Sequence, residues 1–487
     1  MKIAEQATVQ HLIFNLPTPH HITFKSIFLG LLDFTPTSDQ SNLITLLSDY
    51  IFNNNEREIM VIKGYAGTGK TNMIAAFSKT IASFKWKSVL LAPTGKAAKV
   101  LSKYSQKQAQ TIHKKIFIKI PTHDGGVAFS LADNKHTNTI FIVDEASMIG
   151  LDNPTSNSVY HNLLESLLEY VISGTNCKLI MVGDTAQLPP IGSNESPALN
   201  INYLKASYSL QIKHIELKQV ARQQNKSGIL KNATHLRECI EHFTGEFPKI
   251  TLHKDVIHLS GEDLEDALNN AYTRYGFNDV LIITRSNKRA NLFNQAVRSR
   301  VRYMEEDLCG GDLMMVVKNN YFWINEKTEA GFIANGDSLE IKKIIKRKEI
   351  YGFNFAECVV KLTDYENIPE INLMLLLDSI KTEVPALTKE QQQQLFTNVM
   401  EDVNEEPIKS IRMNYLRNSP YYNALQVKFN YAVTCHKAQG GQWPCIFIDQ
   451  GYLTKEMLNI EYIRWLYTAF TRATDQIYLM NFSEDFF

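Results

Sequence analysis

The chain has 487 residues, of which 44% are hydrophobic and 21% are charged. This composition is typical of globular domains with buried cores, and the length predicts two or three such domains. Lysine plus arginine and aspartate plus glutamate both number 51, so the formal net charge is zero. The balance excludes a protein that coats nucleic acid through its overall charge, and it leaves binding through a local groove.

The cysteines and the apolar runs bear on the compartment. The six cysteines are scattered and form no CxxC or Cys/His metal-ligand spacing, which favours reduced thiols in an intracellular protein. No apolar run approaches the ~18 residues that a membrane span needs. Polar residues interrupt the first segment, MKIAEQATVQ, before any apolar core of a signal peptide. We therefore expect a cytoplasmic protein with no membrane partner.

A helix is predicted to begin after Thr37. Thr37 and Gln40 have the spacing of a capping box, and apolar residues recur with helical period from Leu43 to Tyr50. Helix capping is therefore one role for Gln40, and a role as a ligand has equal weight on the sequence alone. Residues 1–25 match no pattern and form an unassigned N-terminal extension.

The segment IMVIKGYAGTGKTNMIAAF contains the strongest motif in the chain. Residues 59–62 form a short apolar run that predicts a buried parallel strand, and residues 64–71 fit the pattern GxxxxGKT. Backbone N–H groups of such a loop surround phosphates, Lys70 reaches the outer phosphates, and the Thr71 hydroxyl binds Mg²⁺. The predicted nucleotide-binding residues of the loop are Gly64, Ala66, Gly67, Thr68, Gly69, Lys70 and Thr71.

Two further buried strands end in polar residues. Residues 140–143 precede Asp144 and Glu145, so that Asp144 can hold Mg²⁺ and Glu145 can orient and deprotonate an attacking water. The segment KLIMVGDTAQLPPIG is the other strand, and it leads to Gln187, an uncharged side chain that suits the sensing of a γ-phosphate. The alternative for Asp144 and Glu145 is that they are two solvated acidic residues at a strand end.

Residues 115–137 predict a β-hairpin. Lysine and apolar residues alternate over residues 115–120, apolar residues return over 127–131, and Asp-Gly-Gly lies between the two runs. Further along, residues 284–302 hold six basic residues and no acidic one, in contrast to the neutral whole. Asn287 and Lys288 follow a predicted strand there and are placed to bind a nucleic-acid backbone, although a basic solvated helix face is the alternative.

Residues 303–424 differ from the flanking sequence. GDSLEIKKI and GFNFAECVVKLTD alternate as strands do and predict a small β-barrel, while residues 387–407 predict an acidic, glutamine-rich helix with a loop. After them, VTCHKAQGGQ combines a histidine, a lysine and tight glycines, which can donate hydrogen bonds to phosphates. A glycine turn before the strand CIFID is the alternative.

In this order the segments resemble superfamily-one DNA helicases of the RecD/Dda type. The resemblance covers nearly the whole chain and is carried by GYAGTGKT, LAPTGKAAKVLS, TIHK, IVDEASMI, VGDTAQLPP, VARQQNKSGIL, VTCHKAQGGQ and LYTAFTRATDQIYL. It implies an α/β fold of two RecA-like P-loop NTPase domains with parallel sheets. The first domain carries a hairpin called the pin, and the second carries the small β-barrel.

The resemblance also implies domain boundaries. We expect the first RecA-like domain at residues 26–197, with the pin at about 115–137. The second RecA-like domain comprises residues 198–302 and 425–487, and the barrel with its acidic helical extension lies between them at 303–424.

Several roles follow from the resemblance alone. Arg472 is implied as an arginine finger and Arg222 as a second γ-phosphate arginine, and both act in catalysis with Lys70, Asp144, Glu145 and Gln187. Gln40 would contact the adenine, and Gln439 and Gly440 would approach the nucleotide cleft. The residues implied to contact DNA are Pro93, Thr94, Lys96, His113, Asn287, Lys288, Thr434 and His436, with Phe117 or Phe129 near the fork.

The expected function is that of an ATP-dependent DNA helicase that moves 5′ to 3′ on single-stranded DNA, with ATP and Mg²⁺ as cofactors. Its expected partners are single-stranded and forked duplex DNA, together with single-strand-binding or repair proteins, and the family's motors work as monomers. One alternative is a single-strand-stimulated ATPase that remodels protein–DNA or protein–RNA complexes. Another is a motor subunit of a larger helicase–nuclease complex.

Overall fold

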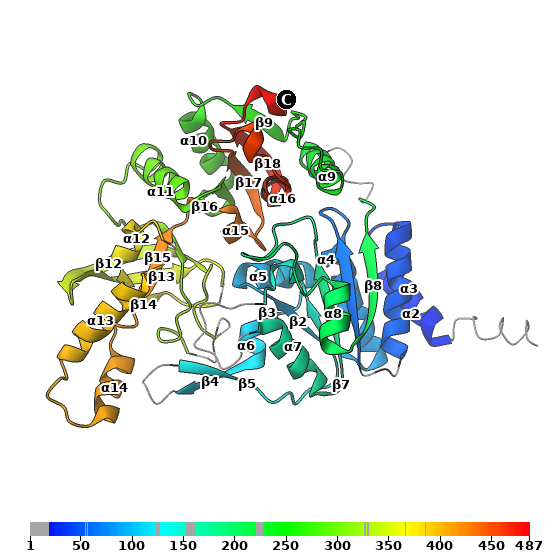
Figure 1. The fold of residues 1–487 in the computed structure, drawn as a ribbon, viewed down its shortest axis with the longest axis horizontal. Coiled ribbons are helices and arrows are strands. Elements are labelled where there is room, and N and C mark those ends of the chain that lie inside the picture. The colour runs from blue at the N-terminus through cyan, green and yellow to red at the C-terminus, as the bar shows by residue number, and fades with distance from the viewer. Residues whose placement is uncertain are drawn as a thin grey trace, which may run out of the picture.

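A computed structural model describes residues 19–487 apart from 54, 56, 122–126, 152–161, 221–226, 326–327, 329–330, 366 and 385. The chain forms two α/β lobes, one above the other, with a β-barrel beside them (Figure 1). No helix among the described residues is long and apolar enough to cross a membrane.

The first lobe is built on a six-stranded parallel sheet. Its strands, in spatial order, are β3 (Ala109–Thr111), β2 (Lys87–Ala92), β6 (Thr137–Val143), β7 (Thr175–Gly183), β1 (Glu58–Gly64) and β8 (Gln211–Leu217). The predicted buried strands at 59–62, 140–143 and 178–183 are confirmed as β1, β6 and β7.

Helices cover both faces of this sheet because its buried side chains alternate. Met60 and Ile62 of β1 pack into one core, with α2 (Pro19–Gly30), α3 (Ser38–Phe52), α4 (Lys70–Thr80) and α5 (Gly95–Ser105). Ile59 and Val61 pack into the other, with α6 (Ile112–Ile116), α7 (Leu163–Ile172) and α8 (Ile201–Tyr208). Burial on both faces explains the continuous apolar runs in the sequence.

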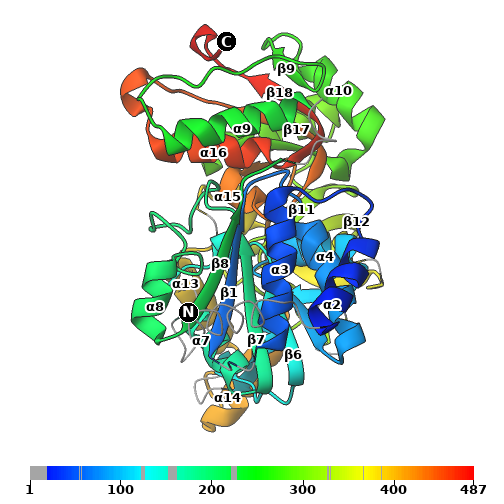
Figure 2. The ribbon, with the colours of Figure 1, turned by 90° about the vertical axis from the view of Figure 1, so that its right-hand side faces the viewer.

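The second lobe is a five-stranded parallel sheet. Its strands, in spatial order, are β16 (Ala432–Thr434), β10 (Val280–Thr284), β17 (Trp443–Asp449), β18 (Ala473–Met480) and β9 (Val256–Leu259). One face packs against α9 (Gly228–Glu241) and α16 (Ile460–Phe470), and the other against α10 (Leu264–Tyr275) and α11 (Asn287–Ala296). The short helix α15 (Cys435–Ala438) lies on the side toward the first lobe (Figure 2).

A closed barrel interrupts the second lobe, as predicted. Its strands are β11 (Leu313–Val316), β12 (Ser338–Ile350), β13 (Phe353–Leu362), β14 (Ile371–Leu376) and β15 (Leu425–Phe429), and α12 (Asp378–Lys381), α13 (Lys389–Glu401) and α14 (Lys409–Asn418) lie between the last two. Strand β15 pairs with both β11 and β14, so it closes the barrel. We therefore place the end of the insertion after Phe429 and not at residue 424.

The hairpin predicted in the first lobe is present as β4 (Phe117–Pro121) and β5 (Val127–Leu131), paired from Phe117 with Leu131 at its base. It extends toward the side on which the barrel lies (Figure 1). The Phe129 ring lies 5.1 Å from the ring of Tyr321, which belongs to the barrel insertion. The insertion therefore supports the hairpin.

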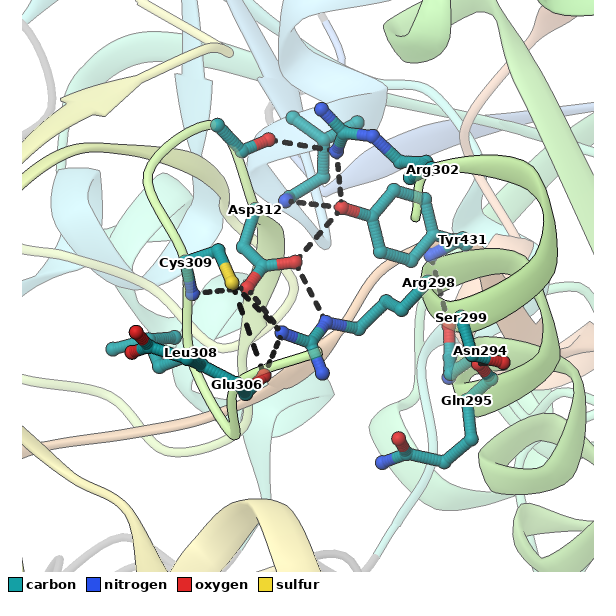
Figure 3. A network of polar contacts seen from close by, with 12 residues as sticks. Asn294, Gln295, Arg298, Ser299, Arg302, Glu306, Leu308, Cys309, Asp312 and Tyr431 are labelled. Atoms are coloured by element: carbon teal, nitrogen blue, oxygen red, sulfur yellow. Dashed lines mark hydrogen bonds and ion pairs between the residues drawn. The ribbon is translucent and has the colours of Figure 1, made fainter. Parts of the chain in front are cut away.

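The barrel is tied to the second lobe by a buried ion pair (Figure 3). Arg298, in the short helix η5 (Val297–Val301), donates from Nε and Nη2 to the two carboxylate oxygens of Asp312, at 2.8 and 2.9 Å. The Tyr431 hydroxyl donates to the same carboxylate at 3.1 Å and accepts from Arg302 and from the Leu313 N–H. Arg298 and Asp312 are 3% and 0% exposed, so each depends on the other for a charged partner.

We predict that Asp312→Ala lowers the free energy of unfolding by roughly 3–5 kcal/mol, because it leaves the Arg298 guanidinium buried without its carboxylate. Asp307→Ala is the matched control. Asp307 pairs with Lys381 at 2.9 Å, but both side chains are about two-thirds exposed, so the expected loss is below about 1 kcal/mol. Urea denaturation of both variants measures the difference, and equal losses would contradict the prediction.

Candidate nucleotide and nucleic-acid sites

The P-loop connects the carboxyl end of β1 to the first turn of α4. Gly67 and Gly69 have φ angles of 76° and 79°, a left-handed conformation that glycine adopts without steric cost. The Lys70 ammonium curls over the loop and donates to the carbonyl oxygens of Gly64 and Tyr65, at 2.7 and 2.9 Å. The loop is therefore tightly turned, with its lysine on the inner side, as the motif requires.

Gln40 has the capping role that the sequence predicts, and it also lies beside the nucleotide loop. It completes the predicted capping box with Thr37, and its Nε2 also donates to the Thr68 carbonyl at 2.9 Å. A Cβ added to Gly69 would lie 2.8 Å from Gln40 Nε2, so the glutamine fills the space that a side chain would need there. Gln40 therefore borders the nucleotide loop, and its contact with the adenine stays a prediction.

Asp144 and Glu145 follow β6 and face the P-loop. The Asp144 Oδ2 lies 3.5 Å from the Thr71 hydroxyl, and its Oδ1 accepts from the Glu145 N–H at 2.9 Å. Burial raises the pKa of Asp144 to about 6, and the neighbouring Glu145 charge adds to this effect. A hydroxyl and a carboxylate side by side are oxygen ligands of the kind that Mg²⁺ prefers, so these residues fit the ion.

Gln187 lies in the loop after β7 and is 5% exposed. Within the described part of the chain, its amide oxygen has no hydrogen-bond partner. A buried acceptor without a donor is costly, so the position favours a bound donor such as a water molecule. An oxygen that accepts from water fits a role in orienting water, whereas the sensing of a γ-phosphate by Gln187 stays a prediction.

The second lobe contributes Arg472 to the same place. Its Nη1 lies 3.9 Å from the Glu145 carboxylate, and its guanidinium is held by the carbonyls of Thr468 and Gly441. The structure thus brings Arg472 to the P-loop lobe, although 327 positions separate it from Glu145 in the chain. Arg222 lies outside the described residues.

The VTCHKAQGGQ segment lies between the two lobes. Gln439 Nε2 donates to the Leu188 carbonyl of the first lobe at 2.8 Å. A Cβ added to Gly440 would lie 2.8 Å from Ala97 Cβ, so only glycine permits this close approach of the lobes. Gln439 therefore borders the loop that follows β7, whereas Gly440 lies against Thr94 and Ala97 at the start of α5.

Sequence reasoning missed Tyr467, which is 1% exposed in α16. Its hydroxyl accepts from the Ala66 N–H of the P-loop at 2.9 Å and donates to the Asp184 carboxylate at 2.7 Å. Burial raises the pKa of Asp184. A tyrosine in an apolar helix gives no signal in a sequence, because most such residues only pack in a core.

The predicted DNA-contacting residues of the first lobe lie around the start of α5. Pro93 and Thr94 form the loop after β2, and Thr94 caps the helix by accepting from the Ala97 N–H at 3.2 Å. Lys96 is only 9% exposed, with its ammonium 5.3 Å from the centre of the Trp443 ring. This lysine therefore faces the second lobe and not open solvent, and burial lowers its pKa.

The corresponding residues of the second lobe gather at one edge of its sheet. Thr434 ends β16 directly opposite Thr284 of β10, and Asn287 and Lys288 begin the helix that follows β10. His436 is half-buried in α15, where burial lowers its pKa. The structure therefore places these four predicted residues at the carboxyl ends of adjacent parallel strands.

His113 and the two hairpin phenylalanines lie together on the first lobe. Burial lowers the pKa of His113 to about 4, so its ring is neutral near pH 7. The Phe117 ring lies 5.7 Å from the His113 ring and 6.3 Å from the Phe129 ring. Both phenylalanines are half-buried, and Phe117 is at the base of the hairpin, away from its turn.

The sequence of this chain is similar to those of known proteins. A model described as AAA domain matches residues 49–243, and one described as UvrD-like helicase C-terminal domain matches residues 429–480. An uncharacterized protein of Acanthamoeba polyphaga mimivirus is 23% identical over 88% of this chain and 96% of its own length. The RecBCD enzyme subunit RecD of Buchnera aphidicola is 24% identical over 91% of this chain and 72% of its own length. The ATP-dependent DNA helicase dda of Enterobacteria phage T4 is 25% identical over 58% of this chain and 60% of its own length.

The fold and the nucleotide loop define a P-loop NTPase with two RecA-like domains, a hairpin inserted in the first and a barrel inserted in the second. Its sequence is similar to RecD and to dda, and these similarities support a RecD-like helicase of superfamily one.

The barrel packs against the start of α5 through a buried carboxylate. Asp337 is 0% exposed, accepts from the Ala334 N–H at 2.7 Å, and lies where a Cβ added to Gly95 would meet it at 2.6 Å. Burial raises the pKa of Asp337 to about 8, and the charge of Asp364 adds to the rise. A carboxyl group with a raised pKa binds its proton more tightly in the folded protein than in the unfolded chain, so stability falls as pH rises from about 4 to about 8.

We predict that Asp337→Asn reduces the loss of stability with rising pH, since the asparagine amide stays neutral. The melting temperature of the variant, relative to the unaltered protein, should rise by several degrees between pH 5 and pH 8. Asp33→Asn, at an exposed carboxylate, should change nothing. A constant difference between Asp337→Asn and the unaltered protein across this pH range would be the contrary result.

Proposed function

We propose that this chain is an ATP-dependent DNA helicase that translocates 5′ to 3′ on single-stranded DNA and unwinds duplex DNA. The observation that carries the proposal is the meeting of Arg472 from one lobe with the Asp144–Glu145 pair and the P-loop of the other. The RecD and dda relatives support DNA as the track, and the direction of movement rests on that resemblance.

The proposed chemistry uses side chains of both lobes. Glu145 would accept a proton from a water molecule that Gln187 orients, and Lys70 and Arg472 would offset the charge that develops on the γ-phosphate. Thr71 and Asp144 would hold Mg²⁺, which would offset the negative charge of the phosphates. Arg222 is proposed as a second arginine of the same site.

Movement would follow from the loss of this shared anion. A triphosphate gripped by Lys70 on one lobe and Arg472 on the other favours the closed arrangement, and hydrolysis removes the group that both cations bind. Opening and closing would then shift two DNA-binding edges relative to each other. Those edges carry Pro93, Thr94, Lys96 and His113 on the first lobe, and Asn287, Lys288, Thr434 and His436 on the second.

The hairpin β4–β5 is proposed as the element that splits the duplex. Phe129 packs between Phe117 and Tyr321, which favours a bracing role for both phenylalanines. Ile118 is 52% exposed on the same hairpin and is free to meet a base pair. We propose that the protein acts as a monomer. Its first RecA-like domain comprises residues 26–197, its second comprises 198–302 and 430–487, and the barrel insertion comprises 303–429.

Strand displacement tests the proposal on forked duplexes with a 5′ or a 3′ loading strand, in the presence of ATP and Mg²⁺. We predict displacement from the 5′-tailed substrate, and its loss in Lys70→Ala together with at least about 100-fold lower ATP hydrolysis. Lys79→Ala, on the outer side of α4, is the control and should behave as the unaltered protein. ATP hydrolysis by Lys70→Ala at the normal rate would show that the site is misplaced.

Unwinding and translocation can be separated at the hairpin. We predict that Ile118→Ala lowers strand displacement several-fold while single-stranded DNA still stimulates ATP hydrolysis, because the substitution removes only an exposed apolar surface. Equal loss of both activities would contradict a role in strand separation. The unaltered protein could also hydrolyse ATP in response to DNA and displace no strand from any substrate. That result would indicate a remodelling ATPase or a subunit of a larger machine.

A further inference from the structure

Tyr467 joins two parts of the nucleotide site across the interface of the lobes. The Ala66 N–H can only donate, so the tyrosine oxygen accepts there, at 2.9 Å, and its own hydrogen points to Asp184 Oδ2 at 2.7 Å. The direction of donation is thereby fixed: the P-loop donates to Tyr467 of the second lobe, and Tyr467 donates to Asp184 of the first lobe. Tyr467 and Asp184 are 283 residues apart in the sequence.

The two partners of Tyr467 belong to loops that surround the phosphate site. Ala66 lies within the P-loop, whose N–H groups surround phosphates in proteins of this class. Asp184 begins the loop that ends at Gln187, and its other oxygen accepts from the Ala186 N–H at 2.9 Å. One hydroxyl of the second lobe therefore fixes the positions of both loops at once.

Neighbouring contacts between the two lobes help to hold Tyr467 in its position. Thr468 Oγ1, the next residue in α16, accepts from the Leu188 N–H at 2.9 Å, and Gln439 donates to the Leu188 carbonyl at 2.8 Å. In Figure 2, α16 and α15 lie along the side of the second lobe that faces β1 and α4. If the lobes part, as the proposed function requires, Ala66 and Asp184 would lose their shared partner together.

We propose that Tyr467 is a positioning residue that couples closure of the lobes to the shape of the P-loop and of the Asp184–Gln187 loop. This inference rests on the proposed function and adds a residue to it. Arg472 acts on the reacting phosphate, whereas Tyr467 acts through Asp184 and the P-loop backbone. Only the closed arrangement would therefore hold Gln187 where it orients the attacking water.

Tyr467→Phe tests the coupling, because phenylalanine keeps the ring and removes only the hydroxyl. In the closed state, the variant leaves the Ala66 N–H and one Asp184 oxygen without their partner, so closure is disfavoured. We expect the DNA-stimulated kcat for ATP to fall about tenfold, with binding of a fluorescent ADP analogue in the absence of DNA changed less than about twofold.

Tyr462→Phe is the matched control. Tyr462 lies in the same helix and is buried, and its hydroxyl has no hydrogen-bond partner within the described residues. Loss of that hydroxyl should therefore leave kcat unchanged. Both variants should melt within a few degrees of the unaltered protein, which separates a positioning role from a structural one.

A double substitution tests whether Tyr467 acts through Asp184. If it does, Asp184→Asn combined with Tyr467→Phe should be no slower than the slower single variant. Additive losses would overturn the link to Asp184, and a normal kcat in Tyr467→Phe would overturn the whole inference. An unaltered protein that hydrolyses no ATP would instead refute the proposed function.

Discussion

Hydrogen bonds and one ion pair that cross from the second lobe to the P-loop lobe determine how the nucleotide site is assembled. Tyr467 contacts Ala66 and Asp184, and Arg472 approaches Glu145. None of these contacts is strong by itself, since each exchanges a bond to water for a bond within the protein. Together they join polar groups of the two lobes, so the site includes Tyr467 and Arg472 only when the lobes lie against each other.

The packing of the two lobes against each other also explains why Lys96, which is proposed to contact DNA, is not a simple surface cation. Lys96 is buried against Trp443 of the second lobe, and barrel carboxylates lie near it. The neutral net charge of the chain is consistent with the proposed DNA binding, which would depend on a few groups placed along an interface and not on overall attraction. In the proposed function, a strand held there would touch both lobes, so their relative motion would be transmitted to it.

The barrel connects the nucleotide motor to the hairpin. The pair formed by Arg298 and Asp312 fixes the barrel to the second lobe, and Tyr321 of the same insertion contacts Phe129 of the hairpin. The hairpin is therefore not an isolated ribbon, which would be marginally stable in water. Its position depends on the lobe that carries it and on the insertion that touches it.

The sequence by itself determined the P-loop, the Asp144–Glu145 pair, the hairpin and the barrel, because each follows from local spacing and strand periodicity. The tertiary structure decided that β15 closes the barrel, that Lys96 is buried and that Tyr467 bonds to the P-loop. These features depend on which segments pack together over hundreds of intervening residues. A tyrosine or a lysine has the same local pattern whether it packs in a core or joins two lobes, so only the packed chain distinguishes the two.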